Sequence, residues 1–338
     1  MNPPVLSRSQ ILSYRRRAGA LDQRLPPSAD SLRVAAFAGL QDSMPRAAML
    51  SIHARMEGTR RDVWEEPGLV QLWGPRFNIY AVAKDDIAVF SLGTMPDDAK
   101  GFARATELAA RLESHLAGTS MPYDQAGAGL GVNPNALRYA AATGTVLIRW
   151  EGAGCPAVWT VPPPDVDPRE ARLELARRYL HVFGPTTAES FGRWAGIGVA
   201  AAQAAFRALS NQLLPVETPI GLAWMLGPDV ATAAEEESRP APVRLVPSGD
   251  AYFLAWDRDR ELLVEDCMRR AQLWTSRVWP GALLIEGEIT GTWRRAGTSL
   301  VVQSWRSLSP GERDAVVAEA ELLPLPTNGR RVAVRFQD

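Results

Sequence analysis

The chain has 338 residues, of which 46% are apolar and 22% charged, and its formal net charge is −1. This length suits about two to four domains, and the composition is that of a soluble globular protein with ample apolar material for buried cores. No apolar run approaches the roughly 18 residues of a membrane span, and the first residues lack the apolar centre of a secretory signal. The sequence therefore predicts a cytoplasmic protein and excludes a membrane partner.

Cysteine and histidine residues are too few and too scattered to form a metal centre. Cys155 and Cys267 lie far apart, neither in a CxxC pair, so neither a disulfide framework nor a cysteine zinc site is indicated. His53, His115 and His181 are equally dispersed. We therefore expect no metal and no organic cofactor.

Positive charge is concentrated at the start of the chain. Residues 1–61 hold ten arginines and four acidic residues, a local excess of +6. Such an excess is typical of a surface that faces nucleic-acid phosphate. Arginine is abundant everywhere, however, since only Lys84 and Lys100 of the 37 basic residues are lysines, and a general compositional bias explains the pattern equally well.

The first part of the chain has the pattern of short helices followed by strands. Ser7 and Gln10 form a capping box, which predicts a helix from about residue 8. Apolar residues then recur at helical spacing in two segments, and FNIYAVA alternates like a strand. The predicted elements are helices over about 29–40 and 46–56, a turn at 41–45 between them, and a strand at 77–83. This pattern predicts a winged helix over residues 1–95.

The same order of helices followed by strands recurs twice. A long helix over about 97–117 and a Gly-rich loop precede the strands TVLIRWEG and PAVWTV. After the break VPPPDVDP, the segment REARLELARRYLHVFG begins a third unit. We interpret these units as winged-helix domains over residues 96–166 and 167–238, although no sequence repeats at a fixed period.

The last part of the chain has a strand-rich pattern that differs from the helical units before it. AEEESRPAP has the composition of a boundary, and alternating strands with Gly-containing turns follow it. One helix, capped by Ser309 and Glu312, interrupts them. The sequence therefore predicts an α+β fold with three tandem winged-helix domains and a C-terminal β-barrel, or half-barrel, over residues 239–338.

Six segments, taken in order, resemble a known family. They are GLQDSMPRAAMLSIHAR, RFNIYAVAKDD, FGPTTAESFGRWAGI, VRLVPSGDAYFLAWDRDR, GALLIEGEITGTWRR and VVQSWRSLSPGERDAV. Together they resemble the winged-helix DNA glycosylases of the YcaQ/AlkZ-like group over about residues 6–325. The resemblance implies three winged helices and a β-barrel around a DNA channel, with removal of alkylated bases, including those in interstrand crosslinks.

The resemblance also places a catalytic motif in GLQDSMPRAA. The family's motif of Gln, an apolar residue, and Gln or Asp falls on Gln41, Asp42 and Ser43. Residues 45–48 fix this alignment without gaps. Gln41 is retained, whereas Asp42 occupies the apolar position and Ser43 replaces the final amide or carboxylate.

The chemistry of alkylated purines indicates what this motif has to do. A purine alkylated at N3 or N7 is already cationic, so the protein mainly has to place a water and dipolar groups beside the developing oxocarbenium ion. The Gln41 amide suits both tasks. We expect Asp42 to project away from Gln41, so either the turn shifts to give Asp42 the second role or activity depends on Gln41 alone. Alternatively, Gln41 and Ser43 only cap the following helix.

The predicted DNA contacts are four arginines and one tyrosine. Arg15 and Arg16 belong to the basic start of the chain, and Arg46 follows the motif. In RFNIY the family usually has Arg, Gly, Thr, an apolar residue and His; here Arg76 is retained and Tyr80 replaces the His. We expect all five to face DNA or the lesion.

The resemblance thus predicts a monofunctional DNA glycosylase that acts as a monomer on double-stranded DNA carrying alkylated bases. It would hydrolyse the N-glycosidic bond and leave an abasic site, in base excision repair or self-resistance, in the cytoplasm at the nucleoid. The alternative is a non-catalytic winged-helix DNA-binding protein, a regulator or lesion binder, whose Gln-Asp-Ser segment is only a turn.

Overall fold

The computed structural model describes residues 2–42, 46–152, 154–235, 238–256, 258–326 and 331–337. Helices and strands alternate through these ranges, so the fold is mixed α+β, as predicted. Ser43, the last position of the predicted catalytic motif, lies outside the described residues. None of the helices that the structure describes is long and apolar enough to cross a membrane.

The first unit brings Gln41 into a strand. The capping box predicted at Ser7 and Gln10 starts α1. α2 ends earlier than predicted because the chain turns at Gly39, whose φ of +70° favours glycine. A two-residue strand then opens the segment that was predicted to be only a turn. The elements are α1 (Arg8–Ala18), α2 (Ala29–Ala35), β1 (Leu40–Gln41), α3 (Ala47–Arg55), β2 (Leu69–Trp73), β3 (Ile79–Ala83) and α4 (Ile87–Ser91).

The first two units share one sheet. In the described residues its strand order is β1-β3-β2-β5-β6-β4. The join is between β2 and β5, where Gln71 pairs with Ile148. The long helix predicted over about 97–117 is α5. The elements of the second unit are α5 (Ala99–Leu116), β4 (Met121–Pro122), α6 (Tyr123–Gly129), α7 (Leu137–Ala140), β5 (Val146–Arg149) and β6 (Ala157–Thr160).

The third unit packs against the start of the chain. Leu6, together with Ile11 and Tyr14 of α1, belongs to a hydrophobic cluster that includes apolar residues of the hairpin β7–β8 and of α11. The Tyr14 hydroxyl donates to the His181 carbonyl oxygen at 2.7 Å. The elements are α8 (Pro168–Phe183), α9 (Ala188–Ala195), α10 (Val199–Ala208), β7 (Leu213–Thr218), β8 (Gly221–Leu226) and α11 (Gly227–Ala234).

The C-terminal part is an open sheet in the described residues, with strand order β13-β12-β11-β10-β9, and a closed barrel is not found. Helices cover this sheet on both faces: α3 and α14 share one hydrophobic cluster with β9, β10 and β12, and α12 and α13 share another with β9, β10 and β11. The elements are β9 (Val243–Val246), α12 (Asp259–Leu263), α13 (Cys267–Leu273), β10 (Gly281–Ile285), β11 (Glu288–Ala296), β12 (Ser299–Ser304), α14 (Pro310–Glu321) and β13 (Ala333–Gln337).

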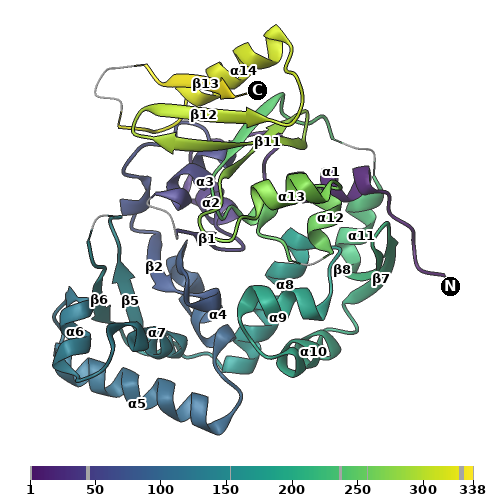
Figure 1. The fold of residues 1–338 in the computed structure, drawn as a ribbon. Coiled ribbons are helices and arrows are strands. Elements are labelled where there is room, and N and C mark those ends of the chain that lie inside the picture. The colour runs from purple at the N-terminus through teal and green to yellow at the C-terminus, as the bar shows by residue number, and fades with distance from the viewer. Residues whose placement is uncertain are drawn as a thin grey trace.

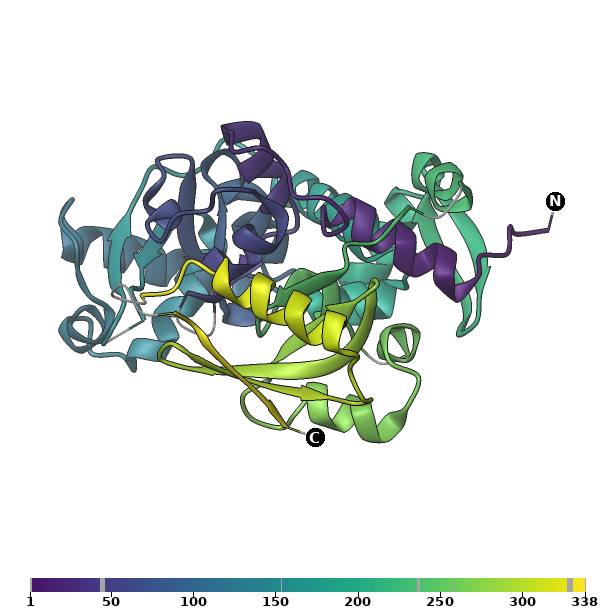
Figure 2. The same cartoon turned by 90° about the horizontal axis from the view of Figure 1, so that it is seen from above.

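These parts surround β1. Figure 1 shows the second unit on one side, the helices α8, α9 and α10 of the third unit on the other, and the C-terminal sheet above them. Figure 2, seen from above, shows α14 lying along this sheet. The strand that carries Gln41 thus lies near the place where all the parts meet.

Candidate active site

Gln41 is positioned by its pairing with β3. Leu40 pairs with Ala81 and Gln41 with Tyr80. The approach to this strand requires a glycine, because a Cβ at position 39 would lie 2.7 Å from Phe90 Cε1. The backbone that presents the Gln41 side chain is therefore fixed on both sides.

The Gln41 amide has defined contacts at both of its ends. Its Oε1 accepts a hydrogen bond from Arg76 Nη2 at 2.8 Å and a longer one from the Tyr80 hydroxyl at 3.4 Å. Because a guanidinium can only donate, the amide oxygen has to face Arg76. The amide nitrogen faces the loop before the short 3₁₀ helix Ala251–Phe253, where a Cβ at Gly249 would lie 3.0 Å from Nε2. The side chain is thus held between β3 and the C-terminal part.

Asp42 points elsewhere and has a structural role. Its Oδ1 accepts from the Ala48 backbone N–H at 3.0 Å, and its Oδ2 accepts from Gln71 Nε2 at 2.9 Å. Burial raises the pKa of this carboxyl to about 6, against the opposing effects of the Ala48 hydrogen bond and the Arg46 charge. Asp42, rather than Gln41, therefore caps the start of α3, and its expected direction away from Gln41 agrees with these contacts.

Gln71 extends this arrangement into the second unit. While its Nε2 donates to Asp42, its Oε1 accepts from the Trp150 backbone N–H at 2.7 Å. Both ends of the amide are used, which orients it uniquely. No local sequence pattern indicates a role for Gln71, because its partners Asp42 and Trp150 come from separate units.

Arg76 lies where the first unit, the third unit and the C-terminal part meet. Its φ of 57° is unusual for a residue other than glycine. Gly196 at the end of α9 packs on its backbone so closely that a Cβ there would lie 2.9 Å from Arg76 N. The half-buried guanidinium also lies 4.8 Å from the centre of the Trp256 ring. Arg76 can therefore place Gln41 relative to both neighbouring parts.

Tyr80 is buried completely, and burial raises the pKa of its hydroxyl. The hydroxyl is therefore neutral at physiological pH and available as a donor to Gln41. A side chain in this position is enclosed by protein, so the predicted contact of Tyr80 with DNA is not supported. Its position supports a different role, in holding the Gln41 amide.

A buried ion pair fixes the loop that faces Gln41. Arg55 near the end of α3 binds both carboxylate oxygens of Asp250, at 2.7 and 2.8 Å. Although burial acts in the opposite direction, the Arg55 charge lowers the pKa of Asp250. Asp250 also accepts from the Tyr252 backbone N–H at 2.9 Å. The loop with Gly249 is thereby tied to the helix that follows Gln41.

An aromatic wall continues from Arg76 into the C-terminal part. The Arg260 guanidinium lies 5.2, 5.0 and 5.4 Å from the ring centres of Trp256, Trp274 and Trp279. Trp279 in turn lines a cavity of about 280 Å³ beside the start of α3, together with Ser248 and Trp293. Arg76, which binds the Gln41 amide, and Arg260 therefore both contact the Trp256 ring.

Comparison with known proteins identifies the family. The family described as DNA glycosylase AlkZ-like matches residues 34–324. The chain belongs to the AlkZ-like DNA glycosylase family. The solved structure of the Streptomyces sahachiroi DNA glycosylase AlkZ matches with a TM-score of 0.80 and 19% identity, covering 98% of this chain and 100% of that chain. This likeness shows a shared fold. A search of curated proteins gives no match.

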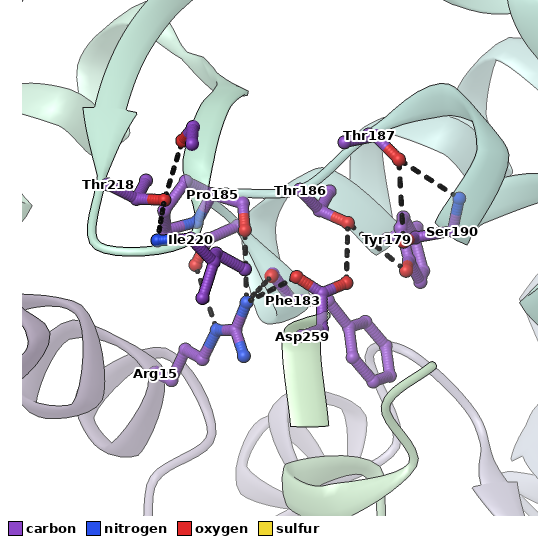
Figure 3. Close-up of polar contacts among 12 residues, drawn as sticks. Arg15, Tyr179, Phe183, Pro185, Thr186, Thr187, Ser190, Thr218, Ile220 and Asp259 are labelled. Carbon is purple, nitrogen blue, oxygen red and sulfur yellow. Dashed lines mark hydrogen bonds and ion pairs between the residues drawn. The ribbon is translucent and has the colours of Figure 1, made fainter. Parts of the chain in front are cut away.

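Arg15 and Arg16, the predicted DNA contacts in α1, are buried inside the protein. Arg15 is 4% exposed, and its guanidinium forms an ion pair with Asp259 at 3.6 Å. Figure 3 shows it among the carbonyl oxygens of residues 183–185, to which it donates at 2.6 to 3.2 Å. Arg16 binds Asp22 at 2.7 Å. Because both guanidinium groups have partners inside the protein, their predicted contact with DNA phosphate is not supported.

Arg46, another predicted DNA contact, lies at the start of α3. Arg46 is half-buried at the N-cap of α3, with a φ of 67° and no capping bond from its side chain. Within the described ranges, His, Cys, Asp and Glu side chains form no group of three that could hold a metal ion. Among the described residues, the side chains that hydrogen-bond the Gln41 amide are the Arg76 guanidinium and the Tyr80 phenol.

Proposed function

We propose that the protein is a monofunctional DNA glycosylase that hydrolyses the N-glycosidic bond of alkylated nucleobases, including bulky or crosslinked ones, and leaves an abasic site. The observation that carries the proposal is the fixed Gln41 amide in a chain of the AlkZ-like DNA glycosylase family. The three units of helices and strands would act as winged helices, and with the C-terminal sheet they would flank duplex DNA.

The proposed reaction requires little acid catalysis. The electron pair of the C1′–N bond leaves with the cationic base, which becomes neutral, and an oxocarbenium-like sugar develops. Water then bonds to C1′ and loses its proton to solvent. Gln41 supplies an oriented dipole and a hydrogen-bonding group for this water, which is an effect of positioning and electrostatics.

The geometry favours Gln41 over Asp42 as the reacting residue. Both carboxylate oxygens of Asp42 are occupied by Ala48 and Gln71, and the side chain is 3% exposed. Gln41 is half-buried, and its amide nitrogen lies beside the loop that contains Gly249. We therefore assign Gln41 to the water and Asp42 to the support of the helix behind it.

Arg76 supports the proposal in a second way. Its hydrogen bond removes rotational freedom from the Gln41 amide before substrate arrives, and such preorganisation lowers the cost of reaching the transition state. Like Arg46, Arg76 is half-buried and stays a proposed contact to a DNA phosphate.

The proposal is tested by incubating the protein with duplex DNA alkylated at guanine N7, heating in alkali, and measuring strand breaks. Breaks that depend on the alkylated base are expected, with none in unmodified duplex. Tight binding without breaks on several such lesions would contradict the proposal and favour the non-catalytic DNA-binding alternative.

A further inference from the structure

The cavity of about 280 Å³ at the start of α3 adjoins the Gln41 amide. Ser248 lines this cavity and directly precedes Gly249, where a Cβ would lie 3.0 Å from Gln41 Nε2. Ala47, the first residue of α3, lines it as well. Because consecutive Cα atoms are about 3.8 Å apart, a ligand in the cavity would lie next to a group held at Gln41.

The charge in this cavity is entirely positive among the lining residues that the structure describes. Arg294 and Arg295 of β11 line it, and none of the other described lining residues is charged. Two guanidinium groups without a carboxylate favour an anionic ligand, because each guanidinium offers several N–H donors and a positive charge. The composition of the lining therefore indicates which kind of ligand the cavity binds.

Arg295 is half-buried and lacks a counter-charge. Within the described ranges its guanidinium forms no hydrogen bond, ion pair or ring contact, and burial alone lowers its pKa. Arg8, Arg55 and Arg178, which are also buried or half-buried, each bind a carboxylate at 2.6 or 2.7 Å. An anion in the cavity would give Arg295 the partner that these arginines find inside the protein.

The C-terminal sheet directs Arg295 toward α3. Arg295 pairs with Leu300 of β12 and lies on the same face of β11 as Trp293, two residues earlier. Trp293 packs in the hydrophobic cluster that α3 shares with the sheet, and its Nε1 donates to the Val246 carbonyl oxygen at 2.9 Å. The Arg295 side chain therefore starts from the side of the sheet on which the cavity lies.

Arg294 connects β11 to the loop on the other side of the cavity. Its Nη2 donates to the Val278 carbonyl oxygen at 3.0 Å, and the Thr275 hydroxyl donates to the same oxygen at 3.0 Å. Arg294 is exposed, and its remaining guanidinium nitrogens form no other hydrogen bond in the described chain. Arg294 thus has donors available at the rim of the cavity, beside Arg295.

We propose that Arg295 and Arg294 bind one phosphate of the DNA backbone within about two nucleotides of the damaged base, since phosphates follow one another at about 3.4 Å along each strand. This inference rests on the proposed function, which brings the damaged base to Gln41. The cavity is slightly smaller than typical sites for organic ligands, at about 300–1,000 Å³, and so suits one sugar-phosphate unit. Val278 and Trp279 offer apolar surface to the sugar.

The test measures binding of duplex DNA by fluorescence anisotropy. The probe is a duplex with a central tetrahydrofuran, a stable analogue of the abasic site, and a second set of duplexes replaces one phosphate at a time by an uncharged methylphosphonate. The proteins are the unaltered chain, Arg295→Gln, Arg294→Gln, and Arg207→Gln as a control at an exposed position of α10. Thermal unfolding shows whether each variant folds, and the exposed position of Arg294 keeps the test valid if Arg295→Gln does not.

Arg295→Gln should raise the Kd for the unmodified duplex about tenfold and reduce the salt dependence of binding by about one phosphate contact, whereas Arg207→Gln should change neither. One methylphosphonate within about two nucleotides of the tetrahydrofuran should weaken the unaltered protein about tenfold but Arg295→Gln less than about twofold, because the partner of that phosphate is already lost. Arg294→Gln should show the same coupling at the same phosphate.

Two results would overturn the proposal: both variants bind the unmodified duplex as tightly as Arg207→Gln, or no phosphate near the tetrahydrofuran is coupled to Arg295 or Arg294. The probe has no base to remove, so the measurement does not depend on catalysis. Failure here with excision intact would leave the glycosylase proposal standing. Coupling without excision would retain the phosphate contact and contradict only the glycosylase proposal.

Discussion

The buried carboxyl of Asp42 makes the stability of the protein depend on pH in an unusual direction. Its pKa is raised from 3.8 to about 6 by burial, with the side chain 3% exposed. Between these two values the folded state binds a proton that the unfolded state does not, so the contribution of Asp42 to stability is greatest at low pH and is lost as pH rises through 6. Integrated from pH 4.5 to pH 7, this proton contributes about 2 kcal/mol.

Asp42→Asn removes the titrating proton, so a comparison of this variant with the unaltered protein measures the contribution of that proton to stability. The substitution also disturbs the hydrogen bond from Gln71, but that loss does not titrate over this range. We therefore expect the free energy of unfolding in urea, measured for both proteins at pH 4.5 and pH 7, to change differently with pH. Relative to the unaltered protein, Asp42→Asn should gain about 2 kcal/mol between pH 4.5 and pH 7. Asp314→Asn, at an exposed position of α14, is the matched control.

The result that would refute this reasoning is a pair of parallel stability curves. If Asp42→Asn and the unaltered protein differ by the same free energy at both pH values, the Asp42 carboxyl does not hold its proton more tightly in the folded state. The inference that burial outweighs the Ala48 hydrogen bond and the Arg46 charge at this carboxyl would then be wrong.

Three further predictions concern the surroundings of Gln41. Gly249→Ala, at a φ of +75° and with its Cβ 3.0 Å from Gln41 Nε2, should lower the single-turnover excision rate more than it lowers the melting temperature. Arg55→Met leaves Asp250 buried without its partner and should cost about 3–5 kcal/mol in urea unfolding; a loss under about 1 kcal/mol would contradict this. Tyr80→Phe removes only the 3.4 Å bond, so its excision rate should fall by less than about tenfold, whereas a complete loss would assign Tyr80 to the chemistry.

Elements with strong local signals were predictable from the sequence. The capping boxes at Ser7 and Ser309 start α1 and α14 as expected, and the long predicted helix is α5. Such signals lie within a few residues of one another, so a local pattern contains them completely. The family prediction is also confirmed, since the six resembling segments lie largely within the matched range 34–324.

The contacts that decide the site could not be read in the same way. Arg55 and Asp250 are 195 residues apart, and Arg15 meets carbonyl groups about as distant. A run of arginines has the same local pattern whether the side chains are exposed to solvent or hydrogen-bonded inside the protein. Arg15 and Arg16 were therefore predicted to contact DNA, although both have buried partners. The strand β1 was also missed, because two residues are too few to show the alternation of apolar and polar side chains that indicates a strand.

The predicted β-barrel is not confirmed, since the described strands form an open sheet. Alternating apolar residues showed that one face of the C-terminal strands is buried, but not what buries it. In the structure α3 and α14 pack on one side of the sheet and α12 and α13 on the other, so its apolar residues are buried without a closed barrel in the described residues. The boundaries given for the three winged-helix domains remain predictions.

The most direct test of the central claim is the single-turnover rate of base excision by Gln41→Ala on duplex DNA containing N7-alkylguanine. The structure predicts a fall of about 100-fold or more at an unchanged melting temperature, because the placed amide is lost while its supports remain. Gln125→Ala, at an exposed position of α6, should retain the full rate. A Gln41→Ala protein that excises the base as fast as this control would contradict the account.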